Sequence, residues 1–279
     1  MPAPDPTRSA ERPLAVVTGP TAGIGRVFAE RLAERGHDLL LVSRDAARLQ
    51  ALAVELAGRH AVHAEVAAHD LSDPAGVEAL ALALAARPRV DVLVNNAGFG
   101  TLGPLARTEP SAQGAMVQLH CATPLRLAQA VLPGTIARRA GLVINVASVA
   151  AFVTGPGNAT YSATKAFVRL LSDGMAAELV GTGVRVQALC PGFTRTEFHG
   201  RMGVAPSDIP RPLWLTAASV VDASLRAADR GGPVTVIPGF HYKLMVAALR
   251  HTPLRVLSWV TRRDRMKRAG NGGVGTAGR

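Results

Sequence analysis

Two side chains four positions apart have the chemistry of an acid–base pair. Tyr161 is the first and Lys165 the last residue of the segment YSATK, residues 161–165. Helix positions i and i+4 share one face, with Cβ atoms about 5–6 Å apart. A free phenol has a pKa of about 10, and a neighbouring ammonium group lowers that pKa. The spacing predicts that Tyr161 exchanges a proton at neutral pH. The alternative, an ordinary surface pair, is the commoner one for an isolated motif.

A hydroxyl group upstream favours the catalytic interpretation. Ser148 lies thirteen positions before Tyr161, just past the apolar run 142–146 that predicts a buried strand. At the carboxyl edge of a sheet it could hold a substrate carbonyl while Tyr161 donates the proton. Lys165 could also donate to the ribose hydroxyls of a bound nucleotide. Ser148 alone would be interpreted as a turn residue.

A glycine-rich segment near the start of the chain predicts a nucleotide site. Residues 18–25 read TGPTAGIG and join the apolar run 14–17 to a helical pattern over 24–35. Glycine lets a backbone approach a pyrophosphate closely, and the helix N-terminus supplies free N–H groups. A tight strand-to-helix connection is the alternative, but the position in a βαβ unit favours a nucleotide. The expected contacts are Gly19, Thr21, Ala22, Gly23, Ile24 and Gly25.

The end of the second predicted strand, 39–42, indicates which nucleotide binds. An acid there would bind both ribose hydroxyls and repel a 2′-phosphate, but the sequence has Ser43 and Arg44. The guanidinium of Arg44 is a planar bidentate partner for phosphate, so the sequence favours NADP(H) over NAD(H). Alternatively Arg44 is solvated and Asp45 supplies the acid, although Asp45 suits a helix N-cap.

Two more segments are expected to contact this nucleotide. Asp70 follows the third strand, 62–66, where its carboxylate could accept from an adenine amine or cap a helix. Asn96, Ala97 and Gly98 follow the fourth strand, 92–94, at the sheet edge where ligands bind, unless they form only an Asn-Gly turn.

Apolar strands alternate with amphipathic helices along most of the chain. Further strands are expected at 184–189 and 234–237, and helices at 45–57, from Ser72 onward and at 160–180. This alternation predicts an α/β fold, a single domain over 14–240 with a doubly wound parallel sheet. Residues 1–13 are expected to be a disordered leader, 241–268 a basic helical C-terminal extension and 269–279 a disordered tail.

The composition narrows the class of protein. Of 279 residues, 48% are hydrophobic, enough for a substantial core. Cys121 and Cys190 match no disulfide framework or metal motif, so we expect a cytoplasmic protein without a metal. Residues 241–279 hold nine basic residues and one acid, which is most of the net charge of +11. We therefore expect no nucleic-acid binding by the domain.

Together these segments resemble the short-chain dehydrogenase/reductase family. The match covers about residues 14–200 through TGPTAGIG, Asp70-Leu71, NNAG, NVAS over 145–148, YSATK and CPGFT over 190–194. It implies a Rossmann-like sheet of about seven strands and hydride transfer between a nicotinamide and a carbonyl or alcohol. It implies Ser148 as carbonyl stabiliser, Tyr161 as general acid–base and Lys165 as cofactor anchor and pKa modifier. The resemblance also implies homodimers or homotetramers. It further implies cofactor contacts from Leu71, Pro191, Gly192, Phe193 and Thr194.

One position departs from the family's pattern. The family often has an asparagine in the helix after NNAG, which completes a proton relay to the lysine through water, and alignment of MVQLHCATPL puts His120 there. Histidine can bind a water and carry a proton, so His120 is a candidate catalytic residue that could also merely pack. It favours the alternative function, a non-catalytic NADP-binding sensor or regulatory protein of the same fold. The intact Ser148, Tyr161 and Lys165 favour the enzyme.

Two apolar segments concern the substrate and partners. In the family, residues 193–215 commonly cover the substrate, which predicts a hydrophobic ketone or acyl substrate unless these side chains only pack on the core. The basic amphipathic segment 242–268 could touch an anionic membrane surface, a dimer partner or the pocket, or simply pack. The apolar residues of the first segment are Phe193, Phe198, Met202, Ile209, Leu213 and Trp214.

Overall fold

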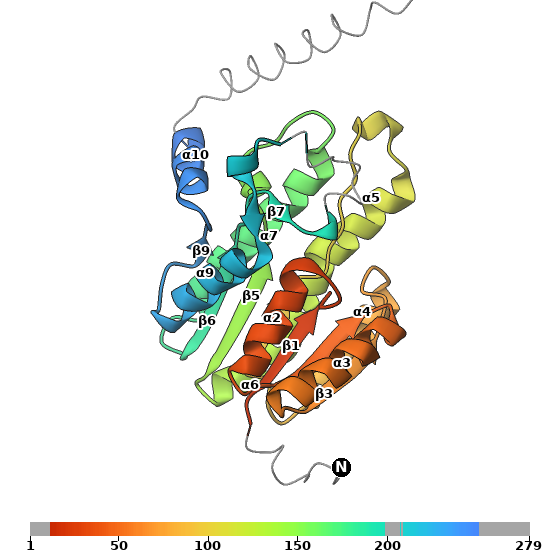
Figure 1. The fold of residues 1–279 in the computed structure, drawn as a ribbon, viewed down its shortest axis with the longest axis vertical. Helices are drawn as coiled ribbons and strands as arrows, with labels where there is room; N and C mark the ends of the chain where they lie inside the picture. Colours follow the sequence, from red (N-terminus) through yellow and green to blue (C-terminus); the bar gives the residue numbers. More distant parts are fainter. Residues whose placement is uncertain (1–11, 199–206, 208, 251–279) are drawn as a thin grey trace, which may run out of the picture.

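Seven parallel strands form one sheet in the order β3-β2-β1-β4-β5-β6-β9 (Figure 1). The structure, a computed structural model, describes residues 12–198, 207 and 209–250. The expected Rossmann-like α/β fold is confirmed, with one domain built on this sheet. Its strands are β1 Leu14–Thr18, β2 Asp38–Ser43, β3 Ala64–Ala68, β4 Val92–Asn95, β5 Gly141–Val146, β6 Val184–Leu189 and β9 Thr235–Val236.

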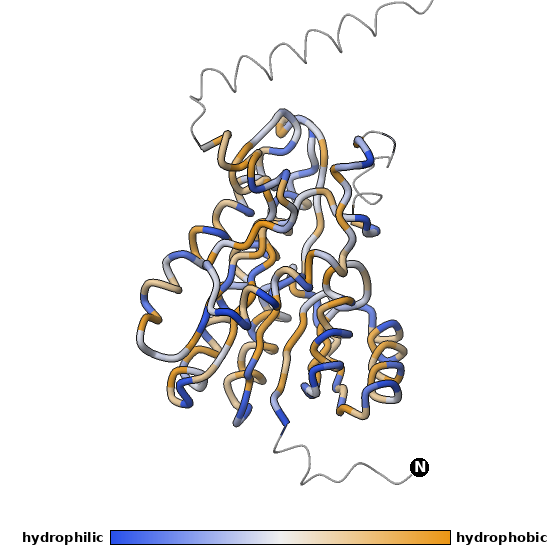
Figure 2. The backbone as a smooth tube through the Cα atoms, turned by 60° about the vertical axis from the view of Figure 1, so that its left-hand side comes forward, coloured by the Kyte–Doolittle hydropathy of each residue, from blue (hydrophilic) through white to orange (hydrophobic). Residues whose placement is uncertain are grey.

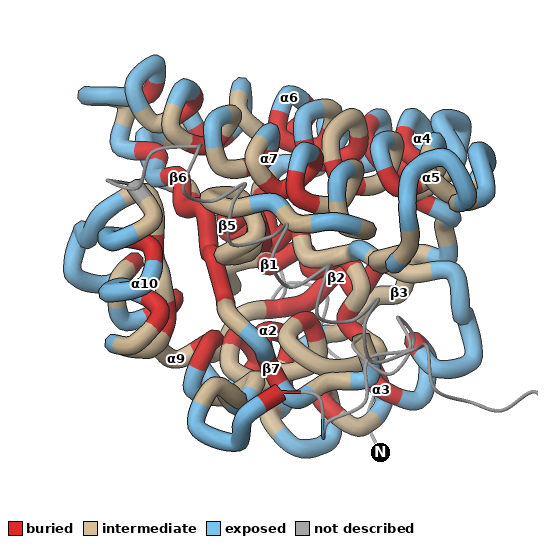
Figure 3. The backbone as a smooth tube through the Cα atoms, turned by 90° about the horizontal axis from the view of Figure 1, so that it is seen from above, coloured by how far each residue is buried: buried red, intermediate tan, exposed pale blue. Residues whose placement is uncertain are grey.

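Helices cover both faces of this sheet, as the view in Figure 3 shows. One face carries α2 (Gly23–Glu34), α3 (Ala46–His60) and α9 (Ala217–Asp229). The other carries α4 (Pro74–Ala85), α6 (Thr123–Ala137) and α7 (Ala159–Glu178), with α5 (Pro110–Val117) beside α7. Because both faces of the sheet are covered, its strands are mainly apolar, which Figure 2 shows as orange runs through the centre of the molecule.

The strand order reverses between β1 and β4, and this reversal positions the site. β1 pairs with β2 on one side and β4 on the other, so the connections that leave β1 and β4 diverge to opposite faces. Ligands bind at such a switch point, outside the carboxyl ends of the strands. The glycine-rich turn after β1 and the NNAG turn after β4 both lie there.

Two local features differ from the sequence expectation. β3 starts at Ala64 rather than at residue 62, because α3 ends through Ala61 in the left-handed conformation at φ 53° and uses the next residues to turn back. A separate two-stranded pair, β7 (Thr194–Arg195) with β8 (Leu215–Thr216), was not predicted. Strands of two residues are too short to show a sequence period.

The predicted extension begins as a packed helix. α10 (Phe240–Arg250) buries Tyr242 and Val246, each with 2% of its surface exposed. The described residues do not include the rest of this extension (251–268) or the predicted tail (269–279). They also leave out Met202 and nearly all of the predicted leader. Within the described part, no helix has the length and apolar character needed to cross a membrane.

Candidate active site

The turn after β1 is shaped to approach a phosphate. Gly19 and Gly23 have φ values of +65° and +57°, and a Cβ on Gly25 would lie 2.2 Å from the Gly19 carbonyl oxygen. This close packing brings the turn down onto the start of α2. Ala22, the N-cap of α2, has no side-chain acceptor for the first N–H groups. The helix start thus offers an anion both its N–H groups and its dipole.

Thr18 and Asn96 hold this turn in place. The Asn96 amide donates to the carbonyl oxygens of Thr18 at 2.9 Å and Gly19 at 3.0 Å. The Thr18 hydroxyl accepts from the N–H groups of Asn96 and Ala97, each at 3.0 Å, and donates to Val94 at 3.2 Å. Sequence reasoning assigned Asn96 to the cofactor and missed Thr18. The signal for Thr18 was its place as the last residue of the first strand.

The ends of β2 and β3 bring Ser43, Arg44 and Asp70 together. Arg44 is exposed, and its guanidinium lies 3.6 Å from the Asp70 carboxylate. Although burial alone would raise it, the pKa of Asp70 is held below its usual value by hydrogen bonds from Ser72. The Ser43 hydroxyl is buried without a hydrogen-bond partner among the described residues. The exposed guanidinium of Arg44 could pair with a 2′-phosphate.

Asp45 is the N-cap of α3, since its carboxylate accepts from the Arg48 N–H at 3.0 Å. The capping interpretation of Asp45 is therefore confirmed, and this carboxylate has a structural use that does not involve a ribose.

Tyr161 and Ser148 meet across two elements. Tyr161 lies in the first turn of α7, and Ser148 caps the short 3-10 turn Val149–Ala151, where its hydroxyl accepts from the Ala150 N–H at 3.1 Å. Burial raises the pKa of Tyr161 to about 12, and a hydrogen bond with Ser148 opposes this rise. The pair can together hold and protonate a carbonyl oxygen.

Lys165 lies behind Tyr161 and is fully enclosed. Its ammonium donates to the Val146 carbonyl at 2.8 Å and lies 5.7 Å from the centre of the Tyr161 ring. Burial lowers the pKa of Lys165 to about 8. The expectation that the pKa of Tyr161 is lowered is therefore wrong, because burial of the phenol is the largest effect on that pKa and raises it.

His120 is brought to this site but both its ring nitrogens are engaged. Nε2 accepts from the Phe99 N–H at 3.3 Å, so the proton lies on Nδ1, which donates to the Thr164 hydroxyl at 3.0 Å. Burial, with a smaller effect of Lys165, holds the pKa of His120 well below its usual value. The imidazole is therefore neutral, and its ring lies edge-on to Tyr161 with centroids 5.9 Å apart. This geometry favours the packing alternative over proton transfer.

The turn that carries His120 is a π-helix over Gln118–Ala122, between α5 and α6. Pro124 follows in the first turn of α6 and has no N–H to continue an α-helical ladder, which accounts for the bulge.

A small cavity lies between His120 and Lys165, and Asn95 also lines it. The Asn95 amide donates to Asn145 at 2.8 Å, and Asn145 donates to Ser172 at 2.9 Å. The side-chain oxygen of Asn95 is buried and, within the described residues, has no partner. The cavity therefore offers a water molecule an acceptor on Asn95 and a donor on Lys165. Sequence reasoning missed Asn95, whose position as the first residue of NNAG was the available signal.

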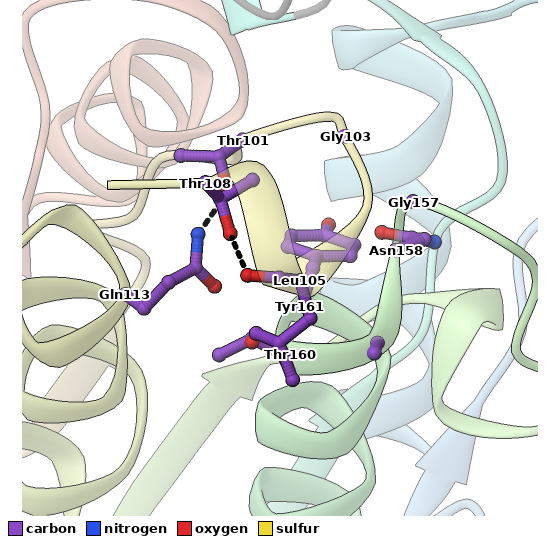
Figure 4. A pocket seen from close by; sticks show the side chains of 10 residues that line it. Thr101, Gly103, Leu105, Thr108, Gln113, Gly157, Asn158, Thr160 and Tyr161 are labelled. Atoms are coloured by element: carbon purple, nitrogen blue, oxygen red, sulfur yellow. Dashed lines mark hydrogen bonds between the residues drawn. The ribbon is translucent and has the colours of Figure 1, made fainter. Parts of the chain in front are cut away.

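A second pocket opens beside Tyr161 and is lined mostly by polar groups. The Gln113 amide donates to the Thr101 hydroxyl at 2.8 Å, and the side-chain oxygen of Asn158 is buried with no partner among the residues described. Figure 4 shows Gln113 and Asn158 on opposite sides of the Tyr161 ring. The lining residues are Thr101, Gly103, Leu105, Thr108, Gln113, Gly157, Asn158, Ala159, Thr160 and Tyr161.

Some side chains of the predicted substrate segment, residues 193–215, lie at the site, and others pack in the core. The Phe198 ring lies 5.9 Å from the Tyr161 ring, and Phe193 packs on Trp214 with ring centroids 6.0 Å apart. Ile209 is buried, in agreement with the packing alternative. The Pro191 carbonyl accepts from Val149 at 3.0 Å and joins this segment to the Ser148 turn.

Comparison with known proteins identifies the family and the fold. Residues 13–204, which include all the predicted catalytic residues, match the family described as short chain dehydrogenase. An NADP-dependent 3-hydroxy acid dehydrogenase of Salmonella typhi is 34% identical over 235 residues, covering 77% of this chain and 93% of that protein.

Two solved structures are similar over most of the chain. A short-chain dehydrogenase from Sphingobium yanoikuyae in complex with NADPH is 34% identical, with a TM-score of 0.78 over 96% of this chain and 98% of that one. A bulky-bulky ketone specific alcohol dehydrogenase from Comamonas testosteroni is 30% identical, with a TM-score of 0.74 over 96% of each chain.

Proposed function

Because this chain belongs to the short-chain dehydrogenases and is an oxidoreductase of that family, we propose that it transfers a hydride between NADP(H) and a carbonyl or alcohol. The observation that carries the proposal is the position of Tyr161 beside a pocket, with the Ser148 side chain acting to lower the pKa of the phenol and the Lys165 ammonium 5.7 Å from the centre of its ring. The cofactor supplies the hydride, and the protein supplies the proton and the position of the carbonyl.

Each member of the catalytic group has a distinct role in this proposal. With a pKa raised to about 12, Tyr161 is protonated at neutral pH and ready to donate to a carbonyl oxygen as the hydride arrives. Ser148 holds the same oxygen from the side of its turn. Lys165 binds the nicotinamide ribose. The neutral His120 supports the Tyr161 ring and the Phe99 backbone rather than carrying the proton.

The phosphate end of the site favours NADP(H) over NAD(H). Arg44 faces solvent, and the unpaired Ser43 hydroxyl lies next to it in the chain. The glycine turn would hold the pyrophosphate, and Asp70 and Leu71 would lie near the adenine. The Sphingobium yanoikuyae relative is in complex with NADPH, which supports the same choice.

The substrate is proposed to be a hydrophobic ketone or acyl compound that also carries a polar group. Phe198 provides an apolar side next to Tyr161, whereas the pocket on the other side presents Gln113, Asn158 and threonine hydroxyls. The named relatives span this range, since one acts on 3-hydroxy acids and another is specific for bulky ketones.

Assembly into a homodimer or homotetramer is proposed from an exposed apolar face. Phe167 and Leu170 of α7 are 40% and 59% exposed, and Leu125 of α6 is 37% exposed. Phe167 and Leu170 lie three positions apart on α7 and so share one face of that helix, and exposed large apolar side chains of this kind are typical of subunit contacts. The two free cysteines, Cys121 and Cys190, fit a reducing cytoplasm.

The direct test is oxidation of NADPH in the presence of a panel of ketones, aldehydes and acyl thioesters, some with a second polar group. We expect turnover with at least one class and a clear loss when NADH replaces NADPH. Ser148→Ala is the matched control and should reduce kcat/KM about 100-fold or more. NADPH binding without turnover across the panel would instead support the sensor function.

A further inference from the structure

The C-terminal helix α10 buries the polar side chain of Tyr242 in the interior of the domain. Tyr242 is 2% exposed, and its hydroxyl accepts from the Phe193 N–H at 2.9 Å and donates to the Leu213 carbonyl at 2.7 Å. A phenol has one proton to donate. Its donor is therefore used on one of these segments while its oxygen accepts from the other.

The Tyr242 ring also explains a glycine in the cofactor motif. A Cβ on Gly192 would lie 2.0 Å from Cζ of Tyr242, well inside van der Waals contact. The bare backbone at Gly192 is thus the surface on which the ring rests. The residue after it, Phe193, is the one whose N–H the hydroxyl holds.

The two groups held by Tyr242 lie just before two paired strands. Phe193 precedes β7, and Leu213 lies two residues before β8. The Leu215 N–H donates to the Phe193 carbonyl at 2.8 Å, and Trp214 packs on the Phe193 ring. One side chain therefore fixes the start of both strands of this pair.

The chain that leaves β7 reaches the two halves of the active site. Thr196 packs against Gly23 of the nucleotide turn, where an added Cβ would lie 2.8 Å from the Thr196 methyl. Phe198 then packs against Tyr161. Residues 194–198 thus follow directly after a residue, Phe193, whose N–H is held by the Tyr242 hydroxyl.

We propose that Tyr242 is a positioning residue for the nicotinamide half of the cofactor site: it holds Phe193 and Leu213 so that residues 194–198 lie across Gly23 and Tyr161. It acts through these segments, because its hydroxyl is bonded to backbone groups of both. The part of the inference that concerns the cofactor rests on the proposed function, whereas the part that concerns residues 193–198 does not.

The first test needs no cofactor. Tyr242→Phe removes the hydroxyl and keeps the ring, and Val246→Ala weakens the packing of the same helix while keeping the hydroxyl. Hydrogen–deuterium exchange read by mass spectrometry should be at least about fivefold faster in peptides covering 193–198 and 211–216 of Tyr242→Phe. Peptides of β1 and β5 should be unchanged, and Val246→Ala should not reproduce the pattern.

The second test separates the two ends of the nucleotide. In Tyr242→Phe the Kd for NADPH should rise about fivefold, while the Kd for adenosine 2′,5′-bisphosphate, which lacks the nicotinamide half, should stay within about twofold. Wild-type exchange rates at 193–198, an equal loss for both nucleotides, or the same changes in Val246→Ala would overturn the proposal. Failure of the wild type to bind NADPH would refute the proposed function, and the exchange result would still decide the role of Tyr242.

Discussion

The affinity for NADPH should fall as pH rises through the pKa of Lys165. The ammonium is enclosed, and burial lowers its pKa to about 8 in the protein without cofactor. The ammonium has three N–H donors and uses one on the Val146 carbonyl, so two remain for the two ribose hydroxyls, whereas the neutral amine would have only one left. The protonated enzyme is therefore the form that binds NADPH well.

The size of the effect follows from this pKa. A group with a pKa of about 8 is about 90% protonated at pH 7 and about 10% protonated at pH 9. Apparent affinity scales with the fraction of the binding-competent form, so the Kd for NADPH should rise about tenfold between these two values. The 2′-phosphate, with a second pKa near about 6, keeps its charge throughout.

The assay is a titration of protein with NADPH, followed by nicotinamide fluorescence in one buffer mixture from pH 7 to 9. Lys165→Met is the matched control, and its weaker affinity should show no step near pH 8. A flat Kd for the wild type, or an equal pH slope in Lys165→Met, would refute the assignment of the ribose contact to Lys165.

Three other substitutions have defined outcomes. Arg44→Ala should raise the Kd for NADPH about tenfold and leave NADH binding unchanged, since it removes an exposed charge-assisted contact; equal effects on both nucleotides would contradict the phosphate role. Gly25→Ala should abolish detectable binding of either nucleotide, because its Cβ would overlap the Gly19 carbonyl, as isothermal calorimetry can measure. Lys165→Met should raise the free energy of unfolding at pH 7 on the order of 2 kcal/mol in urea denaturation, because it removes the cost of burying the ammonium.

The sign of the Lys165 effect on stability can be checked by pH. Its pKa is about 8 when folded and about 10.4 when unfolded. The folded protein is therefore penalised below pH 8, and the penalty fades as pH rises between these values. The advantage of Lys165→Met should shrink from pH 8 to 10, and an advantage that grows with pH would contradict the burial argument.

Local features of the sequence predicted the fold and most of the site. Strands buried on both faces are mainly apolar, so the runs at 14–17, 39–42 and 142–146 could be recognised as strands without any tertiary information. Asp45 was predicted as a cap because capping needs only its own helix. The pairing of Ser148 with Tyr161 followed from the shared edge of the sheet.

Features that depend on tertiary contact were missed. The pKa of Tyr161 was predicted to fall, yet burial, which no helical spacing reveals, raises it to about 12. The Asn95 network runs through β5 and α7, and the Tyr242 contacts join residues 29 and 49 positions apart. Such long-range hydrogen bonds leave no period in the sequence, because each partner is fixed by packing rather than by its neighbours in the chain.

The most direct test of the proposed mechanism is the rate of NADPH oxidation by Tyr161→Phe with the best substrate from the panel. The phenylalanine keeps the ring contact with His120 and removes only the acid. We predict that kcat/KM falls by about 1,000-fold or more, while the Kd for NADPH stays within about twofold. Turnover close to that of the wild type would show that Tyr161 is not the proton donor.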